Sequence, residues 1–434
     1  MTALDVGVIM FGLFAVLIVL RVPVAFALGL ACVPVFFIDD RLTPFLLLNE
    51  MLKSYNSFIL LAIPFFMLSA NLMNSAGVTE RLMELARTMV GWFPGGLGHI
   101  NVVVSMIFAG ISGSSTAEAA GIGGVMIPAM KKQGYDTEFT VALTACAAVM
   151  GVIIPPSILM VVWGGVISVS IGALFLAGVL PGVMIGLSLM GAVYVYAKRR
   201  GYPVYARATL HEFFCAAWRA LLPILTPLII VGGITGGFFT PTEASAIAVL
   251  YALILGLFVM RTIEWGKVPA VLYDSARFAA ISLFCIGTAS AFGWLLAYFH
   301  LPQLFVDAVK GYGGGVTSVG FITAIAFLII GCFIDAIPAI IIVGTVLAPL
   351  AKSVGMHPLH FAIVGVISIA FGLVTPPYGL CLMIACALGK TTIAKAFKDT
   401  MTLLGLMLLV LGFVILFPDV ILALPRWVMP KFVQ

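Results

Sequence analysis

The chain has 434 residues, of which 63% are hydrophobic and only 9% are charged, and its formal net charge is +5. Soluble proteins carry about 25% charged residues, so this composition excludes a soluble globular protein and predicts an integral membrane protein. The small positive charge suits basic cytoplasmic loops and gives no support to nucleic-acid binding. The seven cysteines follow no spacing typical of a metal site or a disulfide framework.

Apolar segments recur along the whole sequence and predict an all-α polytopic membrane protein with about 10–12 spans. The amphipathic segment 78–92 is expected to lie along the membrane interface. The expected spans lie near residues 5–20, 23–38, 57–76, 138–168, 173–196, 219–238, 243–260, 273–299, 358–389 and 396–418.

The stretch GISGSSTAEAAG, residues 110–121, concentrates hydroxyl groups and glycines inside the apolar segment 98–130. A single helix over this segment would extend about 50 Å, well beyond a hydrocarbon core of about 30 Å. A re-entrant helical hairpin broken at 111–115 fits better, because irregular backbone at that depth is tolerated where it is buried in protein or lines a cavity. The spacing from Ser115 to Glu118 is that of a capping box and predicts that the second arm begins there.

The polar groups of this hairpin offer two kinds of ligand. The N-terminus of the second arm can hold an anionic group, and hydroxyl oxygens together with freed backbone carbonyls can bind a small cation. The alternative is that serine and glycine only satisfy and pack against each other where helices meet closely. The hydroxyl groups concerned belong to Ser112, Ser114, Ser115 and Thr116.

The motif GVIIPPS, residues 151–157, interrupts the otherwise apolar segment 138–168. Two prolines remove two backbone donors, so carbonyls about one turn earlier lose their partners and can face a cation. A broken helix is therefore expected, while a simple proline kink is the alternative for one such site. The motif GLVTPPYG, residues 372–379, repeats the arrangement within segment 358–389, where Thr375 adds a hydroxyl.

A basic linker, residues 201–221, is expected to be cytoplasmic. After it, segment 315–351 is expected to form a second re-entrant hairpin with its tip in GCFIDAIPA, residues 331–339. Asp335 in that tip is a functional candidate, because an intramembrane carboxylate is costly. The alternative is that Asp335 caps the following half-helix. A C-terminal tail, residues 421–434, completes the chain.

The two halves of the chain, residues 1–200 and 222–420, share one pattern of motifs. Pro155 and Pro376 each begin a Pro-Pro pair and are separated by 376 − 155 = 221 residues. The basic residues flank different loops in the two halves, so the repeats are expected to be inverted across the membrane, as in many secondary transporters. The same offset pairs Gly110 with Gly331, Gly123 with Gly344, Pro128 with Pro349, Lys131 with Lys352 and Gly151 with Gly372.

Four motifs in this order resemble the large membrane subunit of a tripartite ATP-independent periplasmic (TRAP) transporter: AGISGSSTAEAAGIGGVMIPAMKKQGYD, GVIIPPS, GGFFTPTEASAIA and GLVTPPYG. The resemblance covers essentially the whole chain. It implies an elevator fold like that of the ion-transporter superfamily, in which two hairpins and two broken helices move together in the bacterial inner membrane. It also implies sodium-coupled uptake of a small organic acid, such as a C4-dicarboxylate or sialic acid, delivered by a periplasmic substrate-binding protein.

The resemblance also implies particular ligands and partners. Sodium would be the coupling ion and the only metal, with no other cofactor. Because the sequence begins directly at the first large-subunit span, a separate small four-helix membrane subunit is expected. The first sodium site would use Ser112, Ser114, Ser115, Gly151, Ile154 and Pro156, and the second Gly331, Gly372, Thr375 and Tyr378. The candidates for substrate binding are Ser115, Thr116, Glu118 and Asp335.

Two functions other than that of a binding-protein-dependent transporter subunit are the alternatives. A stand-alone sodium-coupled dicarboxylate or anion transporter of the same architecture would need no binding protein. An enzyme is not expected, since the sequence carries no HExxH motif, paired aspartates or Ser/His constellation, and no residue is assigned as catalytic. In FTPTEAS, Thr240 and Glu243 predict an N-cap and an N3 carboxylate around Pro241.

Overall fold

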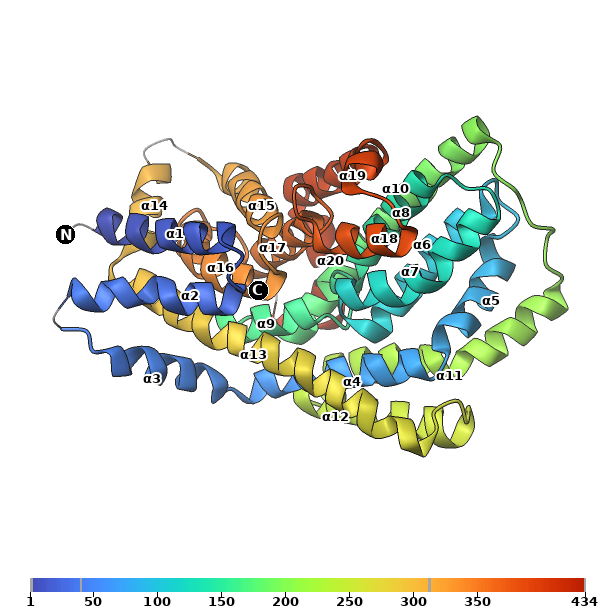
Figure 1. The fold of residues 1–434 in the computed structure, drawn as a ribbon, viewed down its shortest axis with the longest axis horizontal. Coiled ribbons are helices and arrows are strands. Elements are labelled where there is room, and N and C mark those ends of the chain that lie inside the picture. The colour runs from blue at the N-terminus through green and yellow to red at the C-terminus, as the bar shows by residue number, and fades with distance from the viewer. Residues whose placement is uncertain (1–2, 40, 311–313, 433–434) are drawn as a thin grey trace.

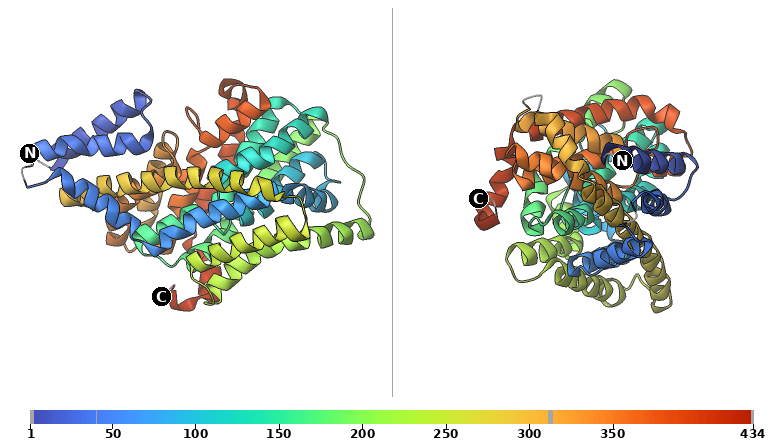
Figure 2. Two further views of the ribbon diagram at one scale, coloured as in Figure 1. Left: turned by 60° about the horizontal axis from the view of Figure 1, so that its bottom comes forward. Right: turned by 90° about the vertical axis from the view of Figure 1, so that its left-hand side faces the viewer.

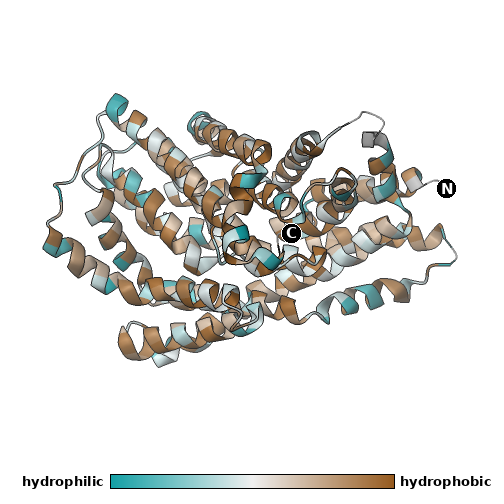
Figure 3. Cartoon of the chain, turned by 180° about the vertical axis from the view of Figure 1, so that it is seen from behind, coloured by the Kyte–Doolittle hydropathy of each residue, from teal (hydrophilic) through white to brown (hydrophobic). Residues whose placement is uncertain are grey.

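The computed structural model describes residues 3–39, 41–310 and 314–432, and every regular element in these ranges is a helix. The helices form an elongated molecule (Figure 1). Hydrophobic residues occupy most of each helix, and hydrophilic residues are frequent at helix ends and in loops (Figure 3). The all-α membrane class predicted from the sequence is confirmed.

The first half of the chain, up to the loop after residue 200, contains ten α-helices and three short 3₁₀ turns. The α-helices are α1 (Ala3–Val19), α2 (Val24–Cys32), α3 (Pro44–Tyr55), α4 (Ala62–Ser75), α5 (Val78–Val90), α6 (Gly96–Ser112), α7 (Ser115–Lys132), α8 (Thr137–Ala148), α9 (Ile158–Ile167) and α10 (Ile171–Arg200). The turns are η1 (Val33–Phe37), η2 (Phe58–Leu61) and η3 (Val149–Val152).

The second half also contains ten α-helices in the part of the chain that the structure describes. Its α-helices are α11 (Leu210–Thr235), α12 (Pro241–Ile254), α13 (Val268–Tyr298), α14 (Leu301–Lys310), α15 (Val316–Gly331), α16 (Ala336–Ser353), α17 (Pro358–Gly372), α18 (Leu380–Gly389), α19 (Ile393–Leu416) and α20 (Pro418–Val428). One long helix, α13, stands where the first half has α3 and α4. A π-helical turn, η4 (Leu255–Val259), follows α12, and 3₁₀ turns η5 (Trp265–Lys267) and η6 (Pro430–Phe432) complete the half.

Seven helices in the described ranges are long and apolar enough to cross a membrane, which supports a multi-pass protein. The remaining apolar helices have 10–17 residues, because glycine, serine and proline interrupt the longer apolar segments of the sequence. The total of about 10–12 spans stays a prediction. The seven long segments are Phe58–Ser75, Ile171–Arg200, Leu210–Thr235, Pro241–Val259, Trp265–Tyr298, Ala336–Ser353 and Ile393–Leu416.

Helix boundaries recur with the offset found in the sequence. α7 and α16 each have 18 residues, and their first residues are separated by 336 − 115 = 221 positions. α8 and α17 begin at positions separated by 358 − 137 = 221. The orientation of the two halves relative to a membrane stays a prediction.

Two predicted segment boundaries differ from the observed helices. α11 begins at Leu210, inside the predicted linker 201–221, because Thr209 and Glu212 form a capping box that starts the helix. α20 extends into the predicted tail 421–434, of which residues 433–434 lie outside the described residues.

The N-cap predicted in FTPTEAS is confirmed. Thr240 is the N-cap of α12, and its Oγ1 accepts a hydrogen bond from the backbone N–H of Glu243 at 3.3 Å. The Glu243 carboxylate accepts one from the backbone N–H of Thr240 at 2.8 Å.

Two groups of helices determine where the candidate site lies. Helices α3, α4, α11, α12 and α13 pack along one side of the molecule, the lower side in Figure 1, and are called the outer layer here (Figures 1 and 2). The hairpins α6–α7 and α15–α16 pack with the broken helices α8–α9 and α17–α18 and are called the hairpin group. α4 contacts α6 and α13 contacts α16, so the outer layer meets both hairpins.

Aromatic packing joins the two halves inside the hairpin group. The indole of Trp163 on α9 is fully buried and lies 5.3 Å, centroid to centroid, from the ring of Phe327 on α15. The ring of Phe361 on α17 lies 5.5 Å from the same indole. Gly365 faces this cluster, where a Cβ atom would collide with Trp163, so the absence of a side chain there permits the close packing.

Candidate functional site

The tip of the first hairpin consists of Gly113 and Ser114, between α6 and α7. Gly113 has a φ of 62°, which favours glycine, and it sets Ser114 in the extended conformation of an N-cap residue. The Oγ of Ser114 accepts a hydrogen bond from the backbone N–H of Ala117 at 3.4 Å. The capping box predicted from Ser115 to Glu118 is therefore wrong by one residue, because Ser114 takes the N-cap and Ser115 is the first residue of the helix.

The first broken helix contacts this tip directly. η3 ends at Val152 and α9 begins at Ile158, with a cis peptide bond between Pro155 and Pro156. The backbone N–H of Ile158 donates a hydrogen bond to the carbonyl of Gly113 at 3.1 Å. A hydrogen bond thus joins the hairpin tip to the start of α9.

The structure brings the backbones of the predicted first sodium site together. The Oγ of Ser112 lies 3.4 Å from the backbone nitrogen of Ser114. A Cβ atom built on Gly151 would lie 3.2 Å from the carbonyl carbon of Ser114, and one built on Gly113 would lie 2.9 Å from the carbonyl oxygen of Pro156. The tip and the helix break are therefore packed backbone against backbone.

The two other residues of that predicted set occupy its edges. Ser115 is buried, and its side chain interacts with the thiol of Cys381 at the start of α18. The side chain of Ile154 packs against Gly182 of α10. Ile154 could therefore contribute only its backbone to a site at the tip.

Glu118 is fully buried on α7, and its carboxyl group has no side-chain hydrogen-bond partner among the described residues. Its Oε2 lies against Gly151, where a Cβ atom would collide with it. This carboxyl group therefore faces the first helix break. An uncompensated charge at this depth is costly, so the carboxyl group is either neutral or balanced by a nearby cation.

The tip of the second hairpin lies between Gly331, the last residue of α15, and Ala336, the first of α16. Asp335 is the N-cap of α16, and its Oδ1 accepts a hydrogen bond from the backbone N–H of Ala336 at 2.8 Å. The capping alternative considered for Asp335 is thus what the structure shows.

The second helix break, residues 373–379, lies beside this tip. A Cβ atom built on Gly372 would lie 2.6 Å from the Cα of Gly331, so these two backbones touch. The Oγ1 of Thr375 donates a hydrogen bond to the carbonyl of Phe371 at 2.7 Å. Tyr378, by contrast, is 50% exposed, so its side chain is separate from the buried part of the predicted second sodium set.

The two tips and the two helix breaks share one small cavity of about 60 Å³. A water molecule takes about 30 Å³ of liquid, so the cavity has room for a small ion or about two water molecules. Helices α4 and α13 contribute Met67 and Ser282 to its lining. The lining from the hairpin group is Gly113, Ser114, Ser115, Thr116, Val152, Ile158, Leu159, Asp335, Ala336, Ile337 and Leu373.

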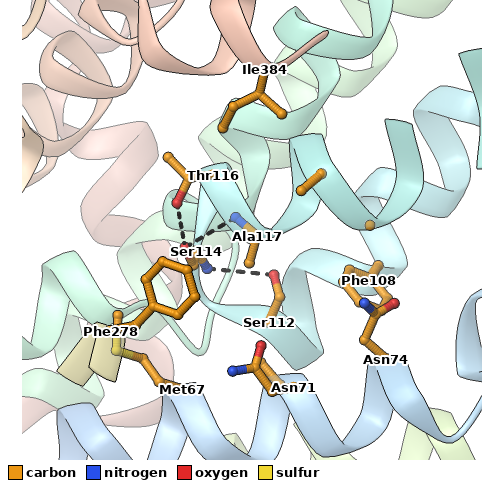
Figure 4. Close-up of a pocket in the computed structure, with 13 residues that line it drawn as sticks. Met67, Asn71, Asn74, Phe108, Ser112, Ser114, Thr116, Ala117, Phe278 and Ile384 are labelled. Atoms are coloured by element: carbon orange, nitrogen blue, oxygen red, sulfur yellow. Dashed lines mark hydrogen bonds between the residues drawn. The ribbon is translucent and has the colours of Figure 1, made fainter. Parts of the chain in front are cut away.

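A larger cavity of about 390 Å³ lies between α4 and the first hairpin (Figure 4). Among the substrate candidates, Thr116 lines both cavities, Ser115 and Asp335 line the small one, and Glu118 lines neither. The sequence reasoning missed Asn71 and Asn74 of α4, which line the larger cavity. Two asparagines three residues apart in an apolar span are a signal that could have found them.

Capped helix N-termini, hydroxyl groups and broken helices that meet in the interior are typical of the substrate and ion sites of secondary transporters. The fold is similar to that of a solved membrane protein. The crystal structure of the YdaH transporter of Alcanivorax borkumensis matches with a TM-score of 0.56 and 12% identity, covering 86% of this chain and 87% of that chain. At this identity the likeness concerns the fold alone.

The family follows from the sequence comparisons. The model of the tripartite ATP-independent periplasmic transporter, DctM component, matches residues 11–420, and the chain belongs to this family of transporter permeases. YgiK of Salmonella typhimurium, described as uncharacterized, is 37% identical over 432 residues, 98% of each chain. The sialic acid TRAP transporter large permease protein SiaM of Vibrio cholerae is 36% identical over 378 residues, 87% of this chain and 88% of that protein. The resemblance found in the sequence motifs is confirmed.

Proposed function

We propose that this chain is the large membrane subunit of a sodium-coupled importer of a small organic acid in the bacterial inner membrane. It works with a small four-helix membrane subunit and a periplasmic substrate-binding protein, as membership of a tripartite family suggests. The observation that carries the proposal is the convergence of two hairpin tips and two helix breaks on one cavity of about 60 Å³.

Sodium is the proposed coupling ion because several residues that line this cavity carry side-chain oxygens: Ser114, Ser115, Thr116, Ser282 and Asp335. Hydroxyl and carboxylate oxygens suit a small hard cation. No cluster of three or more histidine, cysteine or acidic side chains occurs among the described residues, so a transition metal has no support.

An elevator movement is proposed for transport. The hairpin group is closely packed within itself and meets the outer layer chiefly through contacts of α4 and α13 with the hairpins. A compact unit of this kind can slide as one body while the outer layer stays in place with the small subunit.

The substrate is proposed to be a carboxylate. The relative in Vibrio cholerae is named for sialic acid, a carboxylate. In this chain, the N-terminus of α7 borders both cavities through Ser114 and Thr116, and a helix N-terminus favours negative charge.

Uptake into proteoliposomes tests the proposal. Vesicles that contain this chain and its small subunit, supplied with the loaded binding protein outside, should accumulate the acid only with an inward sodium gradient and without nucleotide. Undiminished uptake with potassium or choline in place of sodium would contradict sodium coupling. Robust uptake by the chain alone from free substrate would instead favour a stand-alone transporter.

A further inference from the structure

The larger cavity differs from an ordinary anion site in the charge of its wall. Its lining of described residues contains no lysine, arginine, histidine, aspartate or glutamate. The positive potential at the wall comes from the N-terminus of α7, which is worth about half an elementary charge. Such a wall suits one carboxylate group. A second carboxylate in the same cavity would be desolvated without a partner, which is unfavourable.

The wall opposite α7 carries two amide side chains from α4. Asn71 and Asn74 are three residues apart, so they lie on one face of the helix. The Nδ2 of Asn71 donates a hydrogen bond to Ser275 at 2.8 Å, which leaves its Oδ1 as an acceptor. In Figure 4 this oxygen is directed towards Ser112.

Asn74 is hydrogen-bonded through its amide oxygen, whereas Asn71 is hydrogen-bonded through its amide nitrogen. The Oδ1 of Asn74 accepts a long hydrogen bond of 3.4 Å from Thr79, which leaves its Nδ2 as a donor. The two asparagines therefore offer at least one acceptor, the Oδ1 of Asn71, and one donor, the Nδ2 of Asn74, to the cavity. Hydroxyl groups both donate and accept and can satisfy this pair, whereas a carboxylate only accepts.

The ends of the cavity are apolar. Met67, Phe108, Phe278 and Ile384 line it together with the polar groups (Figure 4). The volume of about 390 Å³ lies within the range of small-molecule pockets. A hydroxylated carbon chain or sugar ring presents C–H faces to such side chains and hydroxyl groups to the amides.

We infer that the transported acid is a hydroxylated monocarboxylate and that Asn71 and Asn74 are specificity-determining residues that bind its hydroxyl groups. The inference rests on the proposed function and adds a substrate class and two residues to it. The carboxylate lies at the N-terminus of α7, beside Ser114 and Thr116, and the hydroxylated part reaches across to α4. A dicarboxylate such as succinate is a poor ligand in this arrangement.

Binding is measured directly, so that the selectivity of the binding protein does not enter. The purified complex of this chain and its small subunit is heated in sodium-containing detergent solution with each of six acids. D-Gluconate, D-glucuronate and N-acetylneuraminate are the hydroxylated monocarboxylates, hexanoate lacks hydroxyl groups, and succinate and adipate are dicarboxylates. At least one of the first three should raise the Tm, and the other three should raise it less. No shift by any of the first three, or an equal or larger shift by succinate, overturns the inference.

Variants then test the two residues. Asn71→Ala and Asn74→Ala should each weaken binding of the hydroxylated acid by about three- to tenfold, the usual effect of one lost hydrogen bond. Ser275 also donates to the carbonyl of Val271 at 2.7 Å, so Asn71→Ala leaves it with a partner. Ser75→Ala, at an exposed neighbour on α4 outside the lining, is the matched control and should leave binding unchanged.

The outcomes separate this inference from the proposed function. Unchanged binding in both asparagine variants overturns the inference, even when uptake by the parent protein requires sodium. Weaker binding in both variants, with Ser75→Ala unaffected, supports the inference. Sodium-independent uptake contradicts the proposed function. The binding measurements on the variants still decide the inference in that case.

Discussion

The two hairpin tips occupy equivalent positions but place their acidic groups differently. Ser114 and Asp335 are related by 335 − 114 = 221, and each is the N-cap of the helix that follows. The first tip has a neutral cap and a buried carboxyl group one turn further, at Glu118. The second tip has its carboxyl group at the cap itself, and Ala339 stands at the position equivalent to Glu118.

Each tip therefore carries one carboxyl group, close to the helix break of its own half. Glu118 is fully buried, whereas Asp335 is exposed, so the two carboxyl groups differ in their access to solvent. A second difference lies in how each tip is held. The first is joined to its helix break by the hydrogen bond from Ile158 to Gly113, whereas the second is held by contact between Gly331 and Gly372.

The largest expected effect concerns that glycine contact. In Gly372→Ala the new Cβ would lie 2.6 Å from the Cα and the carbonyl carbon of Gly331, and neither backbone atom can move aside easily. Overpacking of this kind costs about 1–3 kcal/mol or more. The Tm of the purified protein should fall clearly, and uptake should be lost. Gly405→Ala on α19 is the matched control, because nothing lies within 4 Å of its new Cβ, and it should keep the parental Tm.

The equivalent change in the first half sharpens the comparison. In Gly151→Ala the new Cβ collides with the end of the Glu118 side chain, and its nearest backbone atom, in Ser114, is 3.2 Å away. A side chain can shift more easily than a backbone, so the Tm should fall less than in Gly372→Ala. Adding Glu118→Ala should restore part of the loss. A larger fall in Gly151→Ala than in Gly372→Ala would contradict this account of the two contacts.

Much of this arrangement could be predicted from local sequence. Glycine and serine at 110–115 and the Pro-Pro pairs interrupt apolar segments, and such residues end helices wherever they occur. The cap itself was misplaced by one residue, because Ser114 and Ser115 are both good N-caps. Ser114 takes the cap because the left-handed Gly113 ends α6 directly before it, and the carbonyl of Gly113 is held by Ile158, a contact across 45 positions that local patterns do not contain.

The larger cavity could not be predicted, because its walls come from distant segments. Asn71 lies about forty residues before the first tip, and Phe278 lies far beyond it in the other half of the chain. Only the packing of α4 against α6 of the first hairpin, and of α13 against α4, brings these side chains together. A polar residue in an apolar span indicates a function, but its partner emerges only from the fold.

A smaller effect is expected from the two N-caps. Removing an N-cap side chain costs about 0.5–2 kcal/mol. Asp335→Ala should lower the Tm more than Ser114→Ala, because the Asp335 bond is shorter, 2.8 Å against 3.4 Å, and a charged acceptor forms a stronger bond. Ser114→Asp and Asp335→Asn keep a capping oxygen and should stay near the parental Tm. A larger fall in Tm for Ser114→Ala than for Asp335→Ala would contradict this order and show that the Ser114 cap stabilises the protein more.

The smallest effect is expected from the hydroxyl group that distinguishes the two helix breaks. Thr375 and Ile154 are related by 375 − 154 = 221, so only the second break has a hydroxyl at this position. Thr375→Val keeps the shape of the side chain and removes the hydroxyl. The Phe371 carbonyl, which accepts the bond from Thr375, also accepts one from the backbone N–H of Val374 at 3.1 Å. The cost to the fold should therefore be small, and expression and Tm should stay near parental values.

If the Thr375 hydroxyl oxygen binds sodium, Thr375→Val should raise the sodium concentration for half-maximal uptake by about two- to fivefold, as expected for one lost neutral ligand. The measurement is sodium-dependent uptake in proteoliposomes at saturating substrate. Ile154→Val is the matched control, because Ile154 offers only its backbone, and its sodium dependence should equal that of the parent. An unchanged sodium dependence in Thr375→Val would mean that residue 375 contributes no side-chain ligand. The equivalent residue of the first break, Ile154, has no side-chain oxygen and could contribute only its backbone carbonyl. The two halves would then bind their cations with the same kind of ligand at this position despite their different sequences.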